Sequence, residues 1–342
     1  MSKNRNLIRT WFRKNPELAP LPFVFIFVFA LMSFLTPSRF LRGENIQSMA
    51  LQLPELGILS LAMMITLLSG GLNLSVITTA NLSSLIAALI FTHIYTPDMG
   101  GGTSAMVIVF AIAATILTSL VLGLLNGFLI AIVGVSPILA TLGTMTLFDG
   151  IAIAITKGYV LSDFPTSFQF LGTGTIGGVP FSILIFAVCA FFIALLLNRK
   201  PFGYATYMLG SNEKATKFSG INVRKMILKT YLISGLLSGI AAIVMSARFN
   251  SANAGYGSSY LLITVLIAVL GGVDPFGGFG KVSGLIMALV ILQIISSGLN
   301  LLGVTAFVTL SLWGFILILV MGINRIVEKR RQWRISQDFK AC

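Results

Sequence analysis

Long apolar runs recur along almost the whole chain, and they are compatible with only one class of fold. A helix needs about 20 apolar residues to cross the hydrocarbon core of a bilayer, or fewer where it is broken inside the protein. Ten runs meet this requirement, six before residue 199 and four from residue 226 onward. They span residues 21–35, 46–68, 72–94, 104–133, 138–155, 181–197, 226–245, 261–270, 282–302 and 307–321. The sequence therefore predicts an all-α polytopic membrane protein of about ten transmembrane helices, formed as one domain over residues 1–342.

The placement of basic residues predicts which segments face the cytoplasm. Only 10% of the residues are charged, against about 25% in a soluble domain. A net charge of +13 would suit nucleic acid, but eighteen of the twenty-three basic residues fall within residues 1–14, within 199–229 and after Asn324. Such clusters beside apolar helices favour cytoplasmic retention, and no basic, aromatic-rich face for stacking bases accompanies them. We expect residues 1–20, 199–229 and 324–342 to be cytoplasmic, with no nucleic-acid partner.

The polar stretch 199–229 contains the signals of a short helix. Ser211 and Asn212 can cap a helix N-terminus, and the run Glu213–Phe218 consists of good helix formers with an acid in its first turn. Gly220 fits the left-handed position that ends a helix. An isolated helix needs about 12–15 residues, so this one requires support from the membrane helices or from another protein. The stretch is therefore either a solvated basic loop or a docking element.

Two glycine pairs interrupt apolar runs about two hundred residues apart. The first reads Gly70-Gly71-Leu72-Asn73 and the second Gly271-Gly272-Val273-Asp274. Paired glycine-interrupted segments in two halves of a chain indicate a transport pathway formed by broken helices. The sequence therefore predicts two pseudo-symmetric halves, although glycine pairs are frequent in a chain with 34 glycines.

Polar residues within the apolar runs form a second group of candidates. Glu55 and Asp149 should face the bundle, because a charge near the bilayer centre costs about 2.5–3.5 kcal/mol. Uncharged residues that could bond across helices are Asn126, Thr141, Thr144, Gln293 and Asn300. Together they suit a neutral, hydroxyl-rich solute better than an ion. The predicted translocation path consists of Glu55, Gly70, Gly71, Asn73, Ser75, Asn126, Thr141, Thr144, Gly271, Gly272, Asp274 and Asn300.

Enzyme chemistry has little support in the sequence. The single histidine, His93, lies at the end of an apolar run, and the two cysteines are too few for a metal cage. The stretch Gly277–Lys281 is not a phosphate-binding loop, because Pro275 stands where that motif needs its first glycine. We therefore expect no catalytic residue, no metal and no cofactor, and energy must come from a partner or a gradient.

Four motifs resemble those of ribose-type permeases of bacterial ABC importers. Residues 68–76 (LSGGLNLSV) are similar to the family signature GG-(I/L)-D-L-S-V, and residues 137–145 (PILATLGTM) to P-x-I-A-T-L-G-T-M. The cytoplasmic pattern of the family is matched by Gly203, Ala205, Gly210, Asn212, Ala215, Ser219, Gly220, Ile221 and Val223. Leu270-Gly271-Gly272 followed by Gly277-Gly278-x-Gly280 resembles its late glycine motif. The resemblance extends over residues 51–321.

This resemblance implies that the helix at residues 212–219 is a coupling helix that docks on a cytoplasmic ATPase. It also implies a second permease copy, identical or related, two ATPase subunits, an extracytoplasmic solute-binding protein and the bacterial inner membrane. Asn73 replaces the Asp of the family signature, and Leu261-Leu262-Ile263 replace a Glu-Leu-Asp stretch. Because of these two departures, the resemblance does not identify the solute. The predicted ATPase-coupling residues are Gly203, Gly210, Asn212, Glu213, Lys214, Ala215, Lys217, Ser219 and Gly220.

The sequence thus favours ATP-driven import of a small neutral hydrophilic solute, such as a monosaccharide, polyol or nucleoside, by alternating access. The alternative is an ion-coupled secondary transporter with Glu55 and Asp149 as carriers. A membrane-embedded enzyme with either acid as its base would lack a partner nucleophile.

Overall fold

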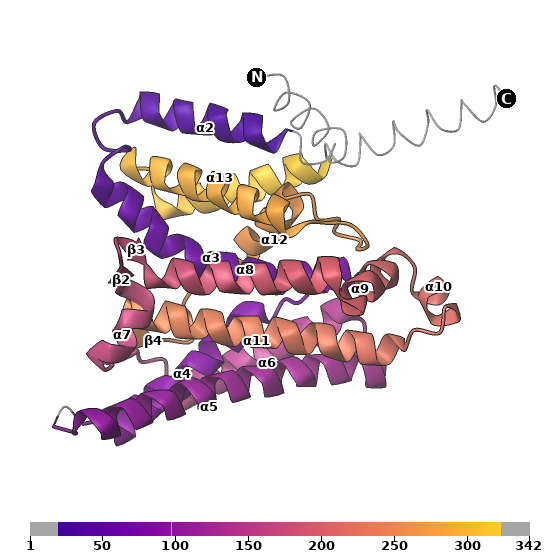
Figure 1. Ribbon diagram of the computed structural model, residues 1–342, viewed down its shortest axis with the longest axis horizontal. Coiled ribbons are helices and arrows are strands. Elements are labelled where there is room, and N and C mark those ends of the chain that lie inside the picture. The colour runs from indigo at the N-terminus through magenta and orange to yellow at the C-terminus, as the bar shows by residue number, and fades with distance from the viewer. Residues whose placement is uncertain (1–19, 97, 323–342) are drawn as a thin grey trace.

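The computed structural model describes residues 20–96 and 98–322, which form a helical bundle (Figure 1). The helices are α2 (Leu21–Leu35), α3 (Gly43–Leu68), α4 (Val76–Ile94), α5 (Gly101–Phe128), the π-helix η1 (Leu129–Val133), α6 (Pro137–Thr156), α7 (Thr166–Thr173), α8 (Phe181–Arg199), α9 (Pro201–Ser211), α10 (Glu213–Phe218), α11 (Val223–Phe249), α12 (Tyr260–Leu270) and α13 (Val282–Leu301). A further apolar helix spans Ala306–Gly322. Two short antiparallel pairs complete the fold, β1 (Leu161–Ser162) with β4 (Ser251–Ala252) and β2 (Thr175–Ile176) with β3 (Val179–Pro180).

The ten predicted apolar runs all coincide with helices. Among the described residues, seven helices are long and apolar enough to cross a membrane: α3, α4, α5 with η1, α6, α8, α11 and α13. Three more apolar helices are shorter, namely α2, α12 and Ala306–Gly322. The prediction of an all-α polytopic membrane protein is confirmed. The main difference in boundaries is that α4 begins at Val76 rather than at residue 72, because residues 71–75 form a non-helical turn.

The helices lie side by side in layers, with α2 and α13 above, α3 and α8 in the middle, and α11 with α4, α5 and α6 below in Figure 1. Helix α3 occupies the centre and packs against α8, α11, α12 and α13. Every residue of α3 from Pro54 to Leu68 is buried, whereas residues 43–53 are wholly or partly exposed. The second half of α3 is therefore the core of the molecule, and its first half borders a surface.

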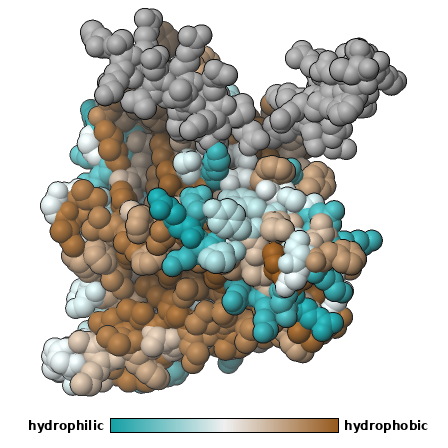
Figure 2. Space-filling model, turned by 45° about the vertical axis from the view of Figure 1, so that its right-hand side comes forward, coloured by the Kyte–Doolittle hydropathy of each residue, from teal (hydrophilic) through white to brown (hydrophobic). Residues whose placement is uncertain are grey.

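The two ends of the bundle differ in structure and polarity. Helices α9 and α10 lie at one end, and α7 with the β2–β3 hairpin lies at the other (Figure 1). Figure 2 shows hydrophobic residues covering the flank of the bundle and hydrophilic residues gathered toward the end with α9 and α10. The predicted cytoplasmic stretch 199–229 lies at this end and is mostly helical. The predicted N-terminal segment and basic tail lie outside the described residues, apart from Pro20.

Helices α5 and α11 cross with their backbones in contact. A side-chain carbon on Gly123 would lie 2.6 Å from the carbonyl oxygen of Tyr231, and one on Gly235 would lie 2.5 Å from that of Ser119. Small residues at such a crossing allow close packing, which replaces the missing hydrophobic driving force between helices in lipid. Helices α5 and α11 are therefore closely packed, and α11 also packs against α3.

The two predicted helix breaks are both present and have the same local geometry. Helices α3 and α12 end in the left-handed residues Gly70 (φ +79°) and Gly272 (φ +81°). At each break, this amide and the next donate to carbonyl oxygens three and five residues earlier, at 2.9–3.0 Å. This is the Schellman arrangement, which satisfies the last carbonyls of a helix. In the structure Gly70 therefore corresponds to Gly272. Aligning the two glycine pairs by sequence would instead match Gly70 with Gly271, one residue earlier.

Candidate functional site

Helix α10 is presented to its surroundings rather than packed into the bundle. Asn212 Oδ1 accepts a hydrogen bond from the Ala215 amide at 3.0 Å, and Gly220 follows the helix with φ +80°. Of the six residues in α10 only Thr216 is buried. The side chain of Phe218 is 92% exposed. The short helix, its cap at Asn212 and its terminating glycine are thus confirmed, whereas Ser211, the other predicted cap, is the last residue of α9. Helix α10 offers both charged and aromatic groups to a partner.

Helix α9, which the sequence did not predict, carries α10. It begins at Pro201, a favourable first residue for a helix, and packs against α3, α8 and α11. A side chain on Gly203 would overlap the carbonyl oxygen of Leu197, because α9 turns back closely on the end of α8. The predicted coupling residue Gly203 therefore lies at this turn. Helix α9 connects α10 rigidly to the rest of the bundle.

Three backbone segments, one of them from α9, meet at a point that we call the glycine junction. The segments are residues 68–71 after α3, residues 277–280 between α12 and α13, and residues 207–211 of α9. A side-chain carbon on Gly277 would lie 2.7 Å from the Gly70 amide nitrogen and 2.9 Å from Gly210 Cα. Such distances are too short for a side chain at Gly277, and a side chain on Gly210 would overlap the carbonyl oxygen of Leu68. Gly70 is favoured by its left-handed backbone, with φ +79°.

Two hydrogen bonds hold the glycine junction together. The Gly278 amide donates to the carbonyl oxygen of Leu68 at 3.0 Å, and so connects the two broken-helix regions. The Tyr207 hydroxyl of α9 donates to the carbonyl oxygen of Gly280 at 2.9 Å. Burial raises the pKa of Tyr207, which keeps this hydroxyl protonated and able to donate. A movement of α9 would therefore displace the loop at residues 277–280 and, through it, the end of α3.

Four residues of the predicted translocation path form one buried hydrogen-bonded network. Asn126 Nδ2 donates to Ser75 Oγ at 2.8 Å, and Thr144 Oγ1 donates to Asn126 Oδ1 at 2.6 Å. Ser75 Oγ donates to Asn73 Oδ1 at 2.9 Å, and Asn73 Nδ2 donates to Ser234 Oγ at 3.0 Å. All five residues are at most 3% exposed. The network joins the turn before α4 to α5, α6 and α11, beside the first helix break.

The network explains why asparagine occupies position 73. The Ser234 hydroxyl uses its own proton to bond the carbonyl oxygen of Ala62 at 3.0 Å, so it can only accept from residue 73. The amide of Asn73 supplies that proton, whereas an ionised aspartate has none. The departure from the family signature is therefore matched to its surroundings in this chain.

The other predicted path residues near the two breaks are packing and turn residues. Gly71 lies against Tyr231, whose hydroxyl would be 2.7 Å from a side-chain carbon at that position. Thr141 Oγ1 donates to the carbonyl oxygen of Leu72 at 3.0 Å. Asp274 Oδ1 accepts from the Phe276 amide at 2.8 Å and so shapes the loop before the glycine junction. Their part in translocation stays a prediction.

Gly271 and Asn300 lie at opposite ends of the second broken region. A side-chain carbon on Gly271 would lie 2.7 Å from Leu285 Cα, so the end of α12 packs tightly on the beginning of α13. Asn300 is exposed at the far end of α13. The structure therefore places Gly271 in the contact between α12 and α13, and Asn300 at the far end of α13.

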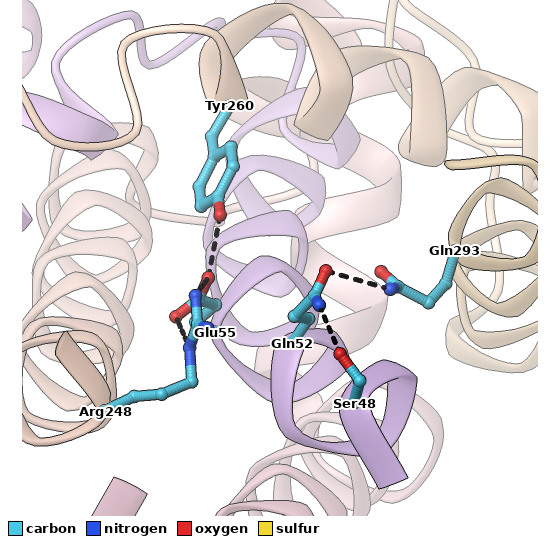
Figure 3. Close-up of polar contacts among 6 residues, drawn as sticks. All are labelled: Ser48, Gln52, Glu55, Arg248, Tyr260 and Gln293. Atoms are coloured by element: carbon cyan, nitrogen blue, oxygen red, sulfur yellow. Dashed lines mark hydrogen bonds and ion pairs between the residues drawn. The ribbon is translucent and has the colours of Figure 1, made fainter. Parts of the chain in front are cut away.

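Glu55 forms a buried ion pair that the sequence did not reveal. The Arg248 guanidinium donates to both of its carboxylate oxygens, from Nε at 2.9 Å and from Nη2 at 2.7 Å. The Tyr260 hydroxyl donates to Oε1 at 2.7 Å (Figure 3). Glu55 itself is fully buried, and Arg248 is the partner that a buried charge requires. Asp149, the other acid within an apolar run, is half-buried on α6.

Two adjoining hollows lie beside this ion pair. The larger, of about 270 Å³, is open and is lined by Glu44, Gln47, Ser48, Leu51, Gln52 and Arg248. The smaller, of about 60 Å³, shares Gln52 and lies deeper, where Leu56, Tyr260, Ile263, Leu292, Gln293, Ser296 and Trp313 line it. The larger is formed by the exposed half of α3 with Arg248 of α11, and the smaller by α3, α12, α13 and the helix Ala306–Gly322.

Comparison with known proteins identifies the family. The family model described as branched-chain amino acid transport system, permease component, matches residues 45–321. The chain belongs to this family. It is a transport permease and, with its several apolar helices, a multi-pass protein of the inner membrane. Together with the relatives described next, this match confirms the resemblance inferred from the four motifs.

The relatives include import permeases for two different solutes. The ribose import permease protein RbsC of Bacillus subtilis is 34% identical over 89% of this chain and 92% of its own length. The autoinducer 2 import system permease protein LsrD of Yersinia enterocolitica is 30% identical over 81% of this chain and 82% of its own. The LsrD protein of Salmonella typhi is 31% identical over 81% of both chains. No solved structure matches the chain.

Proposed function

We propose that this chain is the membrane-spanning permease subunit of an ABC importer. In this role it carries a small neutral hydrophilic solute, a monosaccharide or a related polyol or nucleoside, by alternating access. The observation that carries the proposal is the exposed, capped helix α10, which α9 connects directly to both broken-helix regions. The import permeases for ribose and autoinducer 2 among its relatives support the solute class.

Energy enters through α10 in the proposed mechanism. Closure of a separate ATPase pushes α10, and α9 transmits the displacement because the glycine junction leaves no free space between it and the two breaks. Helices α3 and α12 then reorient about Gly70 and Gly272, whose left-handed backbones form the ends of those helices. Alternating access follows from this movement of rigid helices about a fixed site.

The surface of α10 fits a groove on the ATPase. Lys214 and Lys217 are exposed and can pair with acids on the rim of such a groove. Phe218, which the sequence analysis did not select, exposes 92% of its surface beside them. Aromatic anchors that fill pockets supply much of the binding energy at protein interfaces, whereas exposed ion pairs contribute little. We therefore assign Phe218 as the anchor and the lysines as orienting charges.

The other proposed partners follow from the same arrangement. With α10 in the cytoplasm, the basic N-terminus and tail are cytoplasmic too, and α7 with the β2–β3 hairpin faces outward. An extracytoplasmic solute-binding protein delivers its solute to that outer end. A second permease copy, identical or related, and two ATPase subunits complete the complex.

An ion-coupled transporter is the competing function. A proton or sodium carrier must release and rebind its ion, but both carboxylate oxygens of Glu55 are engaged by Arg248 and Tyr260. This occupancy favours the ATP-driven importer.

Uptake of radiolabelled D-ribose into liposomes separates these two functions. The permease is reconstituted with its partner ATPase and with a solute-binding protein. We expect uptake that requires ATP hydrolysis and does not respond to a proton or sodium gradient. Gradient-driven uptake by the permease alone, without the ATPase, would refute the proposal.

A further inference from the structure

The loop between α12 and α13 exposes two aromatic side chains, and we call residues 274–281 the aromatic loop. Phe276 is 77% exposed and Phe279 is 59% exposed, whereas Gly277 and Gly278 between them are buried. The loop extends toward the end of the bundle that carries α9 and α10 (Figure 1). Exposed aromatic rings on a polar end of a protein indicate a surface that a partner covers.

Hydrogen bonds fix the backbone of the aromatic loop. The side chain of Asp274 accepts from the Phe276 amide at 2.8 Å, and its own amide donates to the carbonyl oxygen of Phe279 at 3.0 Å. The Gly277 amide donates to the carbonyl oxygen of Asp274 at 3.0 Å. The aromatic rings take no part in these bonds. The loop is therefore preorganised, and a partner that binds its rings need not first order the backbone.

The aromatic loop lies at the base of α10. A side-chain carbon on Gly278 would lie 2.9 Å from the amide nitrogen of Ser211, the last residue of α9. The next residue, Asn212, caps α10. Since α10 has six residues, it is only about 9 Å long. Phe218, at the other end of α10, and the two phenylalanines of the loop are therefore within reach of a single partner.

Helix α10 is too small to form a stable interface by itself. Specific protein interfaces involve about 20–30 residues on each side, whereas α10 has six residues, of which Thr216 is buried. A partner that binds α10 must also contact neighbouring surface at the same end of the bundle. The aromatic loop adjoins α10 and exposes the residue type that is enriched in the core of interfaces.

The position of the aromatic loop separates it from the surface that lipid covers. The Gly278 amide donates to the carbonyl oxygen of Leu68, the last residue of α3, and α3 occupies the centre of the bundle. The exposed neighbours of the loop at Ser211 and Asn212 are polar. Figure 2 shows hydrophobic residues on the flank and hydrophilic ones toward the end with α9 and α10. The loop thus belongs to the polar end, where a soluble protein docks.

We propose that the aromatic loop is a second docking element for the ATPase, and that Phe276 and Phe279 enter an apolar pocket on it while α10 binds beside them. This inference rests on the proposed import function and extends its coupling surface from one element to two. Through the bond from Gly278 to Leu68, pressure on the loop reaches the end of α3 without passing through α9.

Truncation of the two rings tests the docking role. The affinity of the detergent-solubilised permease is measured for the ATP-binding-cassette subunit that co-purifies with the wild-type protein. We expect Phe276→Ala and Phe279→Ala each to weaken binding by about tenfold, as for other interface anchors. The midpoint of thermal unfolding should stay unchanged, because both side chains are exposed. Phe192→Ala, in the middle of α8 and 60% exposed, is the matched control and should bind normally.

A spin label distinguishes a protein partner from lipid as the cover of the loop. Phe276→Cys is labelled with a nitroxide in a chain that also carries Cys342→Ser; the remaining Cys189 is buried. In liposomes, we expect collisions with a water-soluble nickel complex, and both these collisions and the mobility of the label should fall when the ATPase binds. A label at Phe192→Cys should collide mainly with oxygen, which concentrates in lipid, whether or not the ATPase is present.

The possible outcomes separate this proposal from the proposed function. Normal affinity in both loop variants, beside weakened binding in Phe218→Ala, would overturn the role of the loop and leave the importer function intact. A label at position 276 that collides mainly with oxygen, and does not respond to the ATPase, would show that lipid covers the loop and would also overturn the proposal. A wild-type permease that binds no ATP-binding-cassette subunit would refute the importer function and the docking element together.

Discussion

Replacing Gly210 with alanine should uncouple ATP hydrolysis from transport. The new methyl group would overlap the carbonyl oxygen of Leu68 and the amide of Gly278. Both are backbone atoms that cannot rotate away, so α9 must shift outward from the glycine junction. Overpacking of this kind costs about 1–3 kcal/mol, and loss of the Leu68–Gly278 hydrogen bond would add about 0.5–1.5 kcal/mol. A coupling energy of about 1–3 kcal/mol corresponds to a change of about 5- to 150-fold in the equilibrium between two states.

The assay for this variant compares two rates in one preparation. Proteoliposomes containing permease, ATPase and solute-loaded binding protein are assayed for phosphate release and for D-ribose uptake. We expect Gly210→Ala to retain hydrolysis while the amount of solute imported per ATP falls at least about fivefold. Gly150→Ala is the matched control, because a side chain there meets no atom within 4 Å and the ratio should not change. A normal ratio in Gly210→Ala would refute the role assigned to the glycine junction.

Four further substitutions test other parts of the structure. Glu55→Gln removes one partner of the buried ion pair with Arg248 and should destabilise the fold by about 3–5 kcal/mol, seen as a lower midpoint of thermal unfolding in detergent; an unchanged midpoint would contradict the pairing. Gly220→Val introduces a β-branched residue at φ +80°, at a cost of about 1–2 kcal/mol without any clash, and uptake should fall while the complex still assembles. Normal uptake by this variant would count against the assignment of α10. Phe218→Ala should weaken binding of the detergent-solubilised permease to its ATPase by about tenfold, whereas Lys217→Ala should change mainly its salt dependence; equal, small effects would argue against an aromatic anchor.

The parts of the fold that could be predicted are those that local sequence determines. Apolar runs specify membrane helices because the bilayer sets their length, and all ten runs are helices in the structure. Helix α10 lies within the predicted range of residues 212–219, because Asn212 caps it and Gly220 follows in a left-handed conformation. The helix breaks at Gly70 and Gly272 could be predicted for the same reason, because a left-handed glycine ends a helix locally.

The parts that could not be predicted depend on contacts between distant residues. Arg248 pairs with Glu55 across 193 positions, and Gln293 meets Gln52 across 241. Neither pairing leaves a local signal, so Glu55 could be selected only as a charge in need of a partner. Asn73 could be noted as a departure from the family signature but explained only once Ser234, 161 positions away, lay beside it.

Helix α9 shows a second limit of sequence reasoning. Its sequence, PFGYATYMLGS, contains two glycines and follows a basic pair, which is typical of a loop. The helix forms because its buried face, which includes Gly203 and Leu209, packs on α3, α8 and α11. Tertiary packing thus outweighs intrinsic propensity, as is usual for short helices. The glycine junction followed from this packing and could not be inferred before it.

The most direct test of the account is the accessibility of α10 on either side of the membrane. A cysteine at Lys214, in a chain carrying Cys342→Ser, is treated with a membrane-impermeant maleimide in intact cells and in inverted vesicles. The account predicts labelling in inverted vesicles alone, and protection from labelling there when the partner ATPase is bound. Labelling in intact cells, or labelling in vesicles that bound ATPase leaves unchanged, would contradict it.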